Sequence, residues 1–299
     1  MQITSPAFKQ NARDALADAQ LQRALGNVRS GFIEKRRRAI DTLPEFERLR
    51  DSARDIKNHT LENLDLYLEA YEAKVLAAGG KVHWAETAED ARGIVLDICR
   101  ANGARTVTKG KSMISEEIGL NDFLEKSGIK PVETDLGEYI IQLRGEHPSH
   151  IIAPAVHLNA DQVEADFRRV HDHLPPSRDL SEAEQLLGEA RRVLRPAYFD
   201  ADVGITGANF LVAETGTSII VTNEGNGDLT QILPRVHVVI ASIEKVVPTL
   251  NDAAQILRVL ARSATGQDMS VYTTLATGPR RPGDPDGPEQ YHVVLVDNG

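Results

Sequence analysis

The sequence predicts an α/β protein with a mostly parallel sheet flanked by helices, preceded by an added helical N-terminal region. Two observations indicate this fold. Apolar residues recur at helical spacing through the first 80 residues, and short β-branched runs then alternate with helical segments. Strands that alternate with helices form βαβ units, whose strands pair in parallel. We therefore expect a helical region at 1–79 and an α/β core at 80–299.

The helical region contains two segments with recognisable ends. The first starts after Ser5-Pro6, because proline is tolerated in a first helical turn. The second covers 43–78, with Thr42 or Asp41 as a cap and Gly79-Gly80 as its end. The basic stretch 34–38 lies between them among acidic residues. This setting favours a solvated helix face over an anion-binding patch.

The core alternates strands and helices. Thr87 is placed to cap a helix over 87–101, and Ser115 one over 115–127. Three close strands separated by glycine turns predict a locally mixed sheet, and the four prolines of 278–288 predict an irregular loop. The predicted strands are 81–84, 105–108, 129–133, 150–153, 203–206, 210–214, 218–222, 236–241, 271–276 and 292–297, and the other predicted helices are 161–173 and 250–263.

Composition excludes several classes of protein. There are 34 Lys and Arg against 44 Asp and Glu, a net charge of −10, which argues against nucleic acid as a partner. The single cysteine, Cys99, excludes a disulfide framework and any site built from several cysteines of this chain. There is no signal-peptide core and no apolar run of about 20 residues, so we expect a cytoplasmic protein without a membrane span. The composition leaves a homo-oligomer open.

The first candidate binding loop follows the strand at 105–108. It places Lys109, Lys111 and Ser112 just ahead of a predicted helix, where ammonium groups and free backbone N–H groups suit an anion. The loop lacks the P-loop spacing, and two solvated lysines are an equally good interpretation.

A carboxylate cluster follows the strand at 129–133. Glu133, Asp135 and Glu138 could supply an acid or base, or hold a cation. Helix capping by Thr134 or Asp135 is the simpler interpretation, and it accounts for one of the three carboxylates.

Three histidines, His147, His150 and His157, lie within eleven residues. Single histidines are more often structural than metal ligands, and a metal site needs further ligands in a defined geometry. We therefore predict no metal site and keep His157 as a candidate ligand-binding residue.

Two further stretches are rich in Gly, Thr and Asn, at 204–217 and 222–228. Glycine lets a backbone approach a ligand closely, and tight turns between short strands also use these residues. Two such turns around one hairpin favour a binding site. The candidates are Asn209, Glu214, Thr215, Gly216, Thr217, Asn223, Glu224, Gly225 and Asn226.

Four strings in this order resemble the lactate-utilisation protein B family, whose shared module is the LUD domain. They are TKGKSMISEEIGLNDFLEKSGIKPVETDLGEYIIQL, PSHIIAPAVHLN, GITGANFLVAETGTSIIVTNEGNGDL and GPRRPGDPDGPEQYHVVLVDNG, within residues 20–299. The resemblance implies a fold like the NagB/RpiA/CoA-transferase group. It also implies a role in oxidising L-lactate to pyruvate, as one subunit of a three-protein iron–sulfur system. Family members usually continue into a segment that binds [4Fe–4S] clusters; with Cys99 alone, these residues hold none.

The abrupt end after a predicted strand favours an excised portion over a natural LUD-only chain. Within this fold group, Glu224 is the nearest match to a catalytic carboxylate on a glycine-rich loop, and Glu214 is the second choice. We expect a small carboxylate or phosphate ligand, with the other subunits of the lactate-oxidation system as partners. The resemblance places the chain in an L-lactate dehydrogenase complex and leaves open whether it is active alone. The alternative is a non-catalytic docking module that positions cluster-bearing segments against partner subunits. The least favoured of the three functions is that of a free-standing CoA transferase or isomerase.

Overall fold

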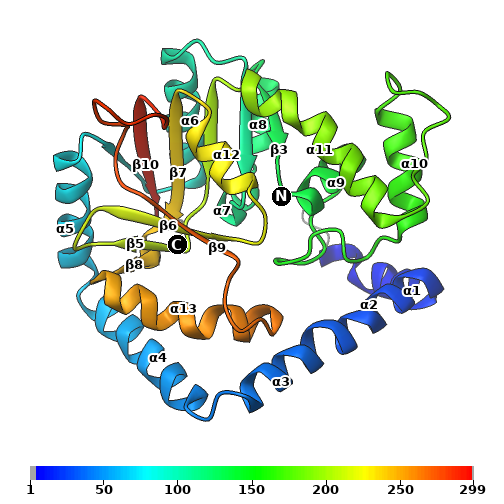
Figure 1. Ribbon diagram of the computed structural model, residues 1–299, viewed down its shortest axis with the longest axis horizontal. Helices are drawn as coiled ribbons and strands as arrows, with labels where there is room; N and C mark the ends of the chain where they lie inside the picture. Colours follow the sequence, from blue (N-terminus) through cyan, green and yellow to red (C-terminus); the bar gives the residue numbers. More distant parts are fainter. Residues whose placement is uncertain (1–4, 298–299) are drawn as a thin grey trace.

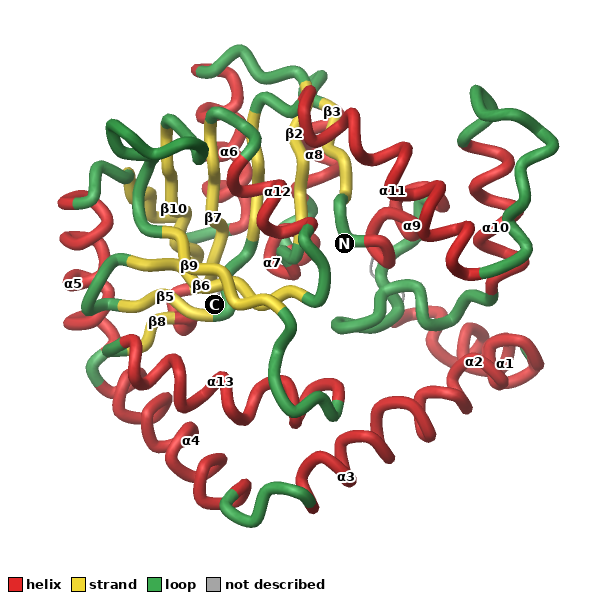
Figure 2. The backbone as a smooth tube through the Cα atoms, in the orientation of Figure 1, coloured by secondary structure: helices red, strands yellow, loops and turns green. Residues whose placement is uncertain are grey.

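A sheet of parallel strands forms the centre of the molecule (Figures 1 and 2). The computed structural model describes residues 5–297. In order across the sheet, the six strands are β1 (Lys81–Ala85), β10 (Gln290–Val296), β7 (Val236–Ser242), β4 (Val203–Thr206), β2 (Thr106–Gly110) and β3 (Lys130–Glu133). Each pairs in parallel with its neighbours. The prediction of a largely parallel α/β sheet is confirmed.

A second, mixed sheet lies beside the first. It pairs β5 (Phe210–Val212) with β6 (Thr217–Thr222) as an antiparallel hairpin, and adds β8 (Val246–Val247) and β9 (Tyr272–Ala276) at its two edges. The locally mixed pairing expected from the three close strands is confirmed, although β5 and β6 belong to this second sheet.

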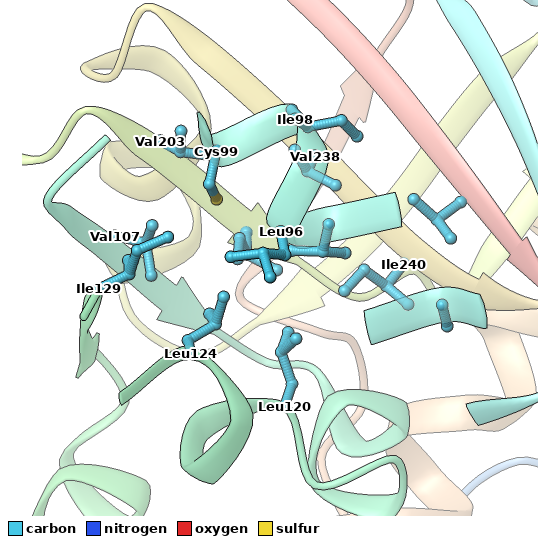
Figure 3. Packing of buried hydrophobic residues seen from close by; sticks show 14 of the residues in the cluster. Leu96, Ile98, Cys99, Val107, Leu120, Leu124, Ile129, Val203, Val238 and Ile240 are labelled. Atoms are coloured by element: carbon cyan, nitrogen blue, oxygen red, sulfur yellow. The ribbon is translucent and has the colours of Figure 1, made fainter. Parts of the chain in front are cut away.

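Helices cover one face of the parallel sheet through a continuous apolar core (Figure 3). The helices are α6 (Ala88–Ala101), α7 (Met113–Glu117) and α8 (Leu120–Lys126). Leu96 and Cys99 of α6 pack with Val238 of β7, all at 7% exposure or less. Thr87 caps α6 as predicted, in a reciprocal arrangement with Asp90.

The opposite face packs against helix α5 (Leu64–Ala77) and the second sheet. Tyr71 and Val75 are fully buried against Val239 and Val293. Before α5, the helices follow one another along the outside of the molecule (Figure 1). They are a 3-10 turn at Ser5–Ala7, α1 (Phe8–Ala17), α2 (Ala19–Val28), a π-helical turn at Arg29–Ile33, α3 (Glu34–Asp41) and α4 (Phe46–Glu62).

A third helical group covers the edge at β3. It contains α9 (Leu136–Arg144), α10 (Ala160–Val170) and α11 (Ala183–Asp200). Gln142 of α9 lies along the outer side of β3. Its amide nitrogen donates to the Pro131 carbonyl at 2.9 Å, and its amide oxygen accepts from the Glu133 N–H at 3.0 Å. The remaining helices are α12 (Asn226–Ile232), a 3-10 turn at Ile243–Lys245 and α13 (Leu250–Thr265).

Several predicted elements are corrected. The strand at 150–153 is wrong, because residues 150–152 form a bend and Ala153 belongs to no regular element. The helix at 115–127 is two helices, since Gly119 between α7 and α8 adopts a left-handed conformation, and its first helix follows Ser112 instead of Ser115. The segment 43–78 breaks at Asn63, between α4 and α5. Four elements, α9, α11, α12 and β8, were not predicted from the sequence.

Residues 5–297 contain no helix with both the length and the apolar character needed to cross a bilayer.

Candidate functional site

Polar side chains gather where β2, β3 and β4 end. Lys109 of β2 is in register with Glu133 of β3, and Gly110 with Thr206 of β4. After β2 the chain moves outward to β3, whereas after β4 it moves to the other side, to β7. Ligands of open parallel sheets bind at such a reversal, outside the carboxyl ends of the strands. This arrangement makes the ends of β2 and β4 the candidate site.

Two glycines allow the chain to close tightly here. A Cβ atom on Gly207 would lie 2.5 Å from the Lys111 carbonyl oxygen and 3.1 Å from the Ser112 Cα. A Cβ atom on Gly110 would lie 2.6 Å from the Thr134 hydroxyl. Lys111 has a positive φ of 54°, the one non-glycine case in the described chain. The loop after β2 is therefore pressed against the start of the chain after β4.

Lys109 is a buried charge whose donors are all used. Its ammonium group donates to Ser115 Oγ at 2.8 Å, lies 2.7 Å from Glu133 Oε1, and also pairs with Glu116. Burial acts to lower the pKa of Lys109, but the surrounding carboxylates outweigh it and raise the pKa. An ammonium group has three N–H donors, so Lys109 has none left for a ligand.

Glu116 and Glu133 both pair with Lys109, but their pKa values shift in opposite directions. The pKa of Glu116 is lowered, because Lys109 outweighs the effect of partial burial. The pKa of the fully buried Glu133 is raised, because burial outweighs the attraction of Lys109. Asn121 donates to Glu133 Oε1 at 2.6 Å.

Lys111 lies closer to solvent and pairs with Asp135. Burial acts to lower the pKa of Lys111, and Asp135 more than compensates, so the pKa is raised. Asp135 also caps α9 by accepting from the Gly137 N–H at 3.1 Å, which confirms the predicted cap.

Glu138 does not complete a capping box and lies buried in the cluster. Burial, then the charges of Glu133 and Asp135, raise its pKa to about 8. Glu138 is therefore mostly protonated at neutral pH. Its Oε2 atom has no hydrogen-bond partner among the described residues. Glu224 faces the same cluster from the loop before α12, and partial burial, then Asp135, raise its pKa.

Further side chains at this site have buried polar atoms without a partner in residues 5–297. They are the hydroxyl of Ser112, 1% exposed, both amide atoms of Asn226, 6% exposed, Glu133 Oε2 and the amide oxygen of Asn121. Asn226 is four residues before Thr230 on α12, so both lie on one helix face. The Thr230 hydroxyl is 3.2 Å from that of Thr134, beside the end of β2. Asn226 is thus buried on the side of α12 that covers the cluster.

Other predicted site residues lie elsewhere. The Glu214 carboxylate accepts from the Leu250 N–H at 3.2 Å, at the start of α13, and Gly216 packs on the backbone of α5. Thr215 bonds to Thr217, which also bonds to Thr277. This turn is at the far end of the β5–β6 hairpin from Asn209, about 16 Å away at 3.3 Å per strand residue. The structure does not bring 214–217 to the cluster.

Asn209 accepts from the Val221 N–H at 2.8 Å, and Asn223 and Gly225 are exposed in the loop around Glu224.

The three histidines of 147–157 make different contacts. His157 lies 3.0 Å from Glu146 and 2.8 Å from Ser149, inside its own loop. His150 accepts from two backbone N–H groups, and His147 is close enough to act electrostatically on Glu116. In the part of the chain that the structure describes, no group of three or more His, Cys, Asp or Glu side chains could hold a metal ion. An iron–sulfur cluster does not fit either, because Cys99 is the one cysteine and burial raises its pKa to about 12.

Three partners of this site, Glu116, Asn121 and Thr230, were not predicted from the sequence, and Thr134 was expected only as a helix cap. A usable signal was present for Glu116. Lys109 lies within a buried strand, and a buried ammonium group requires carboxylate partners. Glu116, seven residues later on the next helix, was within reach.

Comparison with known proteins identifies a family whose members resemble this chain. Residues 68–296 match the model of the LUD domain. Over 300 aligned positions the chain is 40% identical to lactate utilization protein B of Bacillus licheniformis and 39% identical to that of Bacillus subtilis strain 168. It is 41% identical over 293 residues to the uncharacterized electron transport protein YkgF of Escherichia coli K12.

These alignments cover 98–100% of this chain, and the chain spans 61–62% of the length of those relatives. A crystal structure of a DUF162 family protein from Deinococcus radiodurans matches with a TM-score of 0.39 and 16% identity, over 78% of this chain and 98% of the other.

Proposed function

The chain belongs to the LUD domain family, and from this premise we propose that it takes part in the oxidation of L-lactate to pyruvate. The observation that carries the proposal is about 40% identity along the whole chain to proteins named for lactate utilization. The similarity to an electron transport protein supports a place in an iron–sulfur subunit. Its partners would be the other subunits of a cytoplasmic system, and its fold a variant of the NagB/RpiA/CoA-transferase group.

The ligand would bind where β2 and β4 end, against the start of α12. Lys111, Ser112 and Asn226 offer an ammonium group, a hydroxyl and an amide there. Oxidation of a 2-hydroxy acid to a 2-oxo acid releases two electrons and two protons. Glu224 is the carboxylate we propose as the base that takes the hydroxyl proton, while the hydrogen of the broken Cα–H bond leaves with the two electrons toward the acceptor. The residues of this chain supply binding and proton transfer, and the electrons pass to an acceptor outside them.

Calorimetric titration with L-lactate and with pyruvate tests this site. We expect Lys111→Ala to weaken binding about tenfold, a loss of about 1.4 kcal/mol, because the side chain supplies a positive charge beside the ligand. Lys126→Ala, an exposed lysine of α8, is the matched control and should bind like the wild type. Equal affinity of wild type and Lys111→Ala would remove Lys111 from the site.

A second candidate function, docking without chemistry, rests on the N-terminal helices. Phe8 and Leu16 of α1 are 70% and 73% exposed, and a cavity of about 580 Å³ lies between α2 and residues 156–159. If docking is the function, deleting residues 1–28 should abolish co-purification with co-expressed subunits of the lactate-oxidation system. No small acid should then raise the melting temperature. A ligand-induced rise would favour the binding function.

A further inference from the structure

The candidate site has more acidic groups than basic ones. Five carboxyl groups surround two ammonium groups, so full ionisation would give a net charge of 2 − 5 = −3. The three donors of Lys109 are already bound, and Lys111 pairs with Asp135. A free anion entering this site would meet repulsion that the paired lysines do not offset. The five carboxyl groups are Glu116, Glu133, Asp135, Glu138 and Glu224.

Three groups of the site have unused hydrogen-bonding capacity and carry no charge while Glu138 is protonated. They are the Ser112 hydroxyl, the Asn226 amide and the carboxyl group of Glu138, each more than nine-tenths buried and each with an unpartnered polar atom in the described structure. Glu133 Oε2 and the amide oxygen of Asn121 also lack a partner among the described residues. A protonated carboxyl group can donate a hydrogen bond, whereas an ionised one can only accept. These three groups together can receive a carboxylate only while Glu138 keeps its proton.

We propose that this site takes a small monocarboxylate together with one proton held on Glu138, and that it rejects phosphate dianions. The inference rests on the ligand site of the proposed function and specifies its substrate class. A proton on Glu138 removes one negative charge and adds one donor, which together accommodate a single incoming charge. A phosphate monoester carries nearly two negative charges at neutral pH and would need a second proton.

Several charged groups act on Glu138. Glu133 comes from β3, Asp135 from the turn after it, Lys109 from β2 and Lys111 from the following loop. The two carboxylates favour protonation of Glu138, and the two lysines oppose it. A bound carboxylate adds a third negative charge, so binding should strengthen retention of the proton. Glu224 also faces Asp135 and Lys111, with Tyr198 of α11 nearby.

The test measures pyruvate binding by calorimetry from pH 6 to 9.5, with glycerol 3-phosphate as the phosphate probe. We expect wild-type affinity to be constant at low pH and to fall about tenfold per pH unit once Glu138 ionises, because each ligand then brings in a proton. In Glu138→Gln, whose amide keeps a donor without titrating, affinity should no longer fall in this way. Glu125→Gln, an exposed residue of α8, should follow the wild type.

Two buffers of different ionisation heat give the proton count directly for the wild type, so the test does not depend on the folding of Glu138→Gln. Uptake approaching one proton above pH 8.5, with no binding of glycerol 3-phosphate, would support the inference. A pH-independent wild-type affinity, or glycerol 3-phosphate binding as tightly as pyruvate, would overturn it and leave the proposed function intact. Absence of binding by both pyruvate and L-lactate would overturn the two together.

Discussion

At the scale of single residues, Lys109 shows how a buried charge is held by its neighbours. The ammonium group has as many acceptors as it has donors, two of them carboxylates. Such a group is costly to bury and costly to remove, because removal leaves the carboxylates without their counter-charge. Lys109 is therefore a structural residue of the site, and Lys111 is the lysine that a ligand can reach.

We expect Lys109→Met to lower the free energy of unfolding by about 3–5 kcal/mol at pH 7. Methionine fills a similar volume but leaves Glu116 and Glu133 facing each other. The deficit should shrink as pH falls, since protonation relieves the unpaired carboxylates. In the wild type, Glu116 stabilises the folded state because its pKa is lowered there. This stabilisation is present above the unfolded pKa of Glu116 and is lost on acidification, so the wild type becomes less stable as pH falls.

Urea denaturation at pH 7 and at a pH below about 4, under the unfolded pKa of a glutamate, measures both effects. Lys126→Met on the surface of α8 is the control, with an expected change within about 0.5 kcal/mol. A loss below about 1 kcal/mol for Lys109→Met would contradict the role assigned to the buried ion pairs.

Much of the site could be predicted from residue types at strand ends. Lys109, Lys111, Ser112, Glu133, Asp135, Glu138, Glu224 and Asn226 all came from motifs that follow strands, and the structure brings them to one sheet edge. The sequence could not show which lysine would be buried and paired with two carboxylates, because that depends on Glu116 and on pairing between β2 and β3. Nor could it show that Glu214 and Asn209 lie at opposite ends of one hairpin.

At the scale of elements, strands with β-branched runs were predictable, whereas a helix that begins in a glycine-rich stretch was not. The stretch around Asn226 has the composition of a turn, yet α12 begins there, because its side chains pack on the ends of β2 and β4. The segment 150–153 is apolar enough for a strand, but the N–H groups of Ile152 and Ala153 donate to the ring of His150. Tertiary packing decided the first case and local side-chain hydrogen bonds the second.

The loops after β2 and β4 are in contact, and this contact depends on Gly207. We expect Gly207→Ala to lower stability by about 1–3 kcal/mol, because its Cβ would lie 2.5 Å from a backbone carbonyl that cannot move without shifting Lys111. Pyruvate affinity should fall as well, since the same loop carries Ser112.

Gly93→Ala is the matched control, in the middle of α6 with open space around it. It should raise stability by about 0.5–1 kcal/mol, as alanine is the better helix former. Thermal and urea unfolding report both variants. A stable Gly207→Ala protein with wild-type affinity would show that the two loops are not tightly coupled.

At the scale of the whole molecule, the division between the N-terminal region and the core remains a prediction. The described residues of α1 and α2 bury no side chain, whereas α5 contributes Tyr71 and Val75 to the core with β7 and β10. We expect deletion of 1–33 to change the melting temperature by only a few degrees. Deletion of 1–79 should prevent cooperative unfolding, because the core would lose one of its covering layers.

Circular dichroism during heating distinguishes these two deletions. A cooperative transition in the chain that starts at residue 80 would place the boundary at residue 79, as the sequence predicts, and would make α5 dispensable. Loss of cooperativity in that chain alone would place the boundary before α5.

The edge of the parallel sheet at β3 affects how readily molecules can associate by pairing strands. An open sheet margin normally offers donors and acceptors that template another chain. Here Gln142 occupies the outward carbonyl of Pro131 and the outward N–H of Glu133, and proline itself has no N–H to offer. The amide of one side chain thus takes the place of a seventh strand. The Gln142 amide and the helices that cover this edge together block growth into fibrils by strand addition.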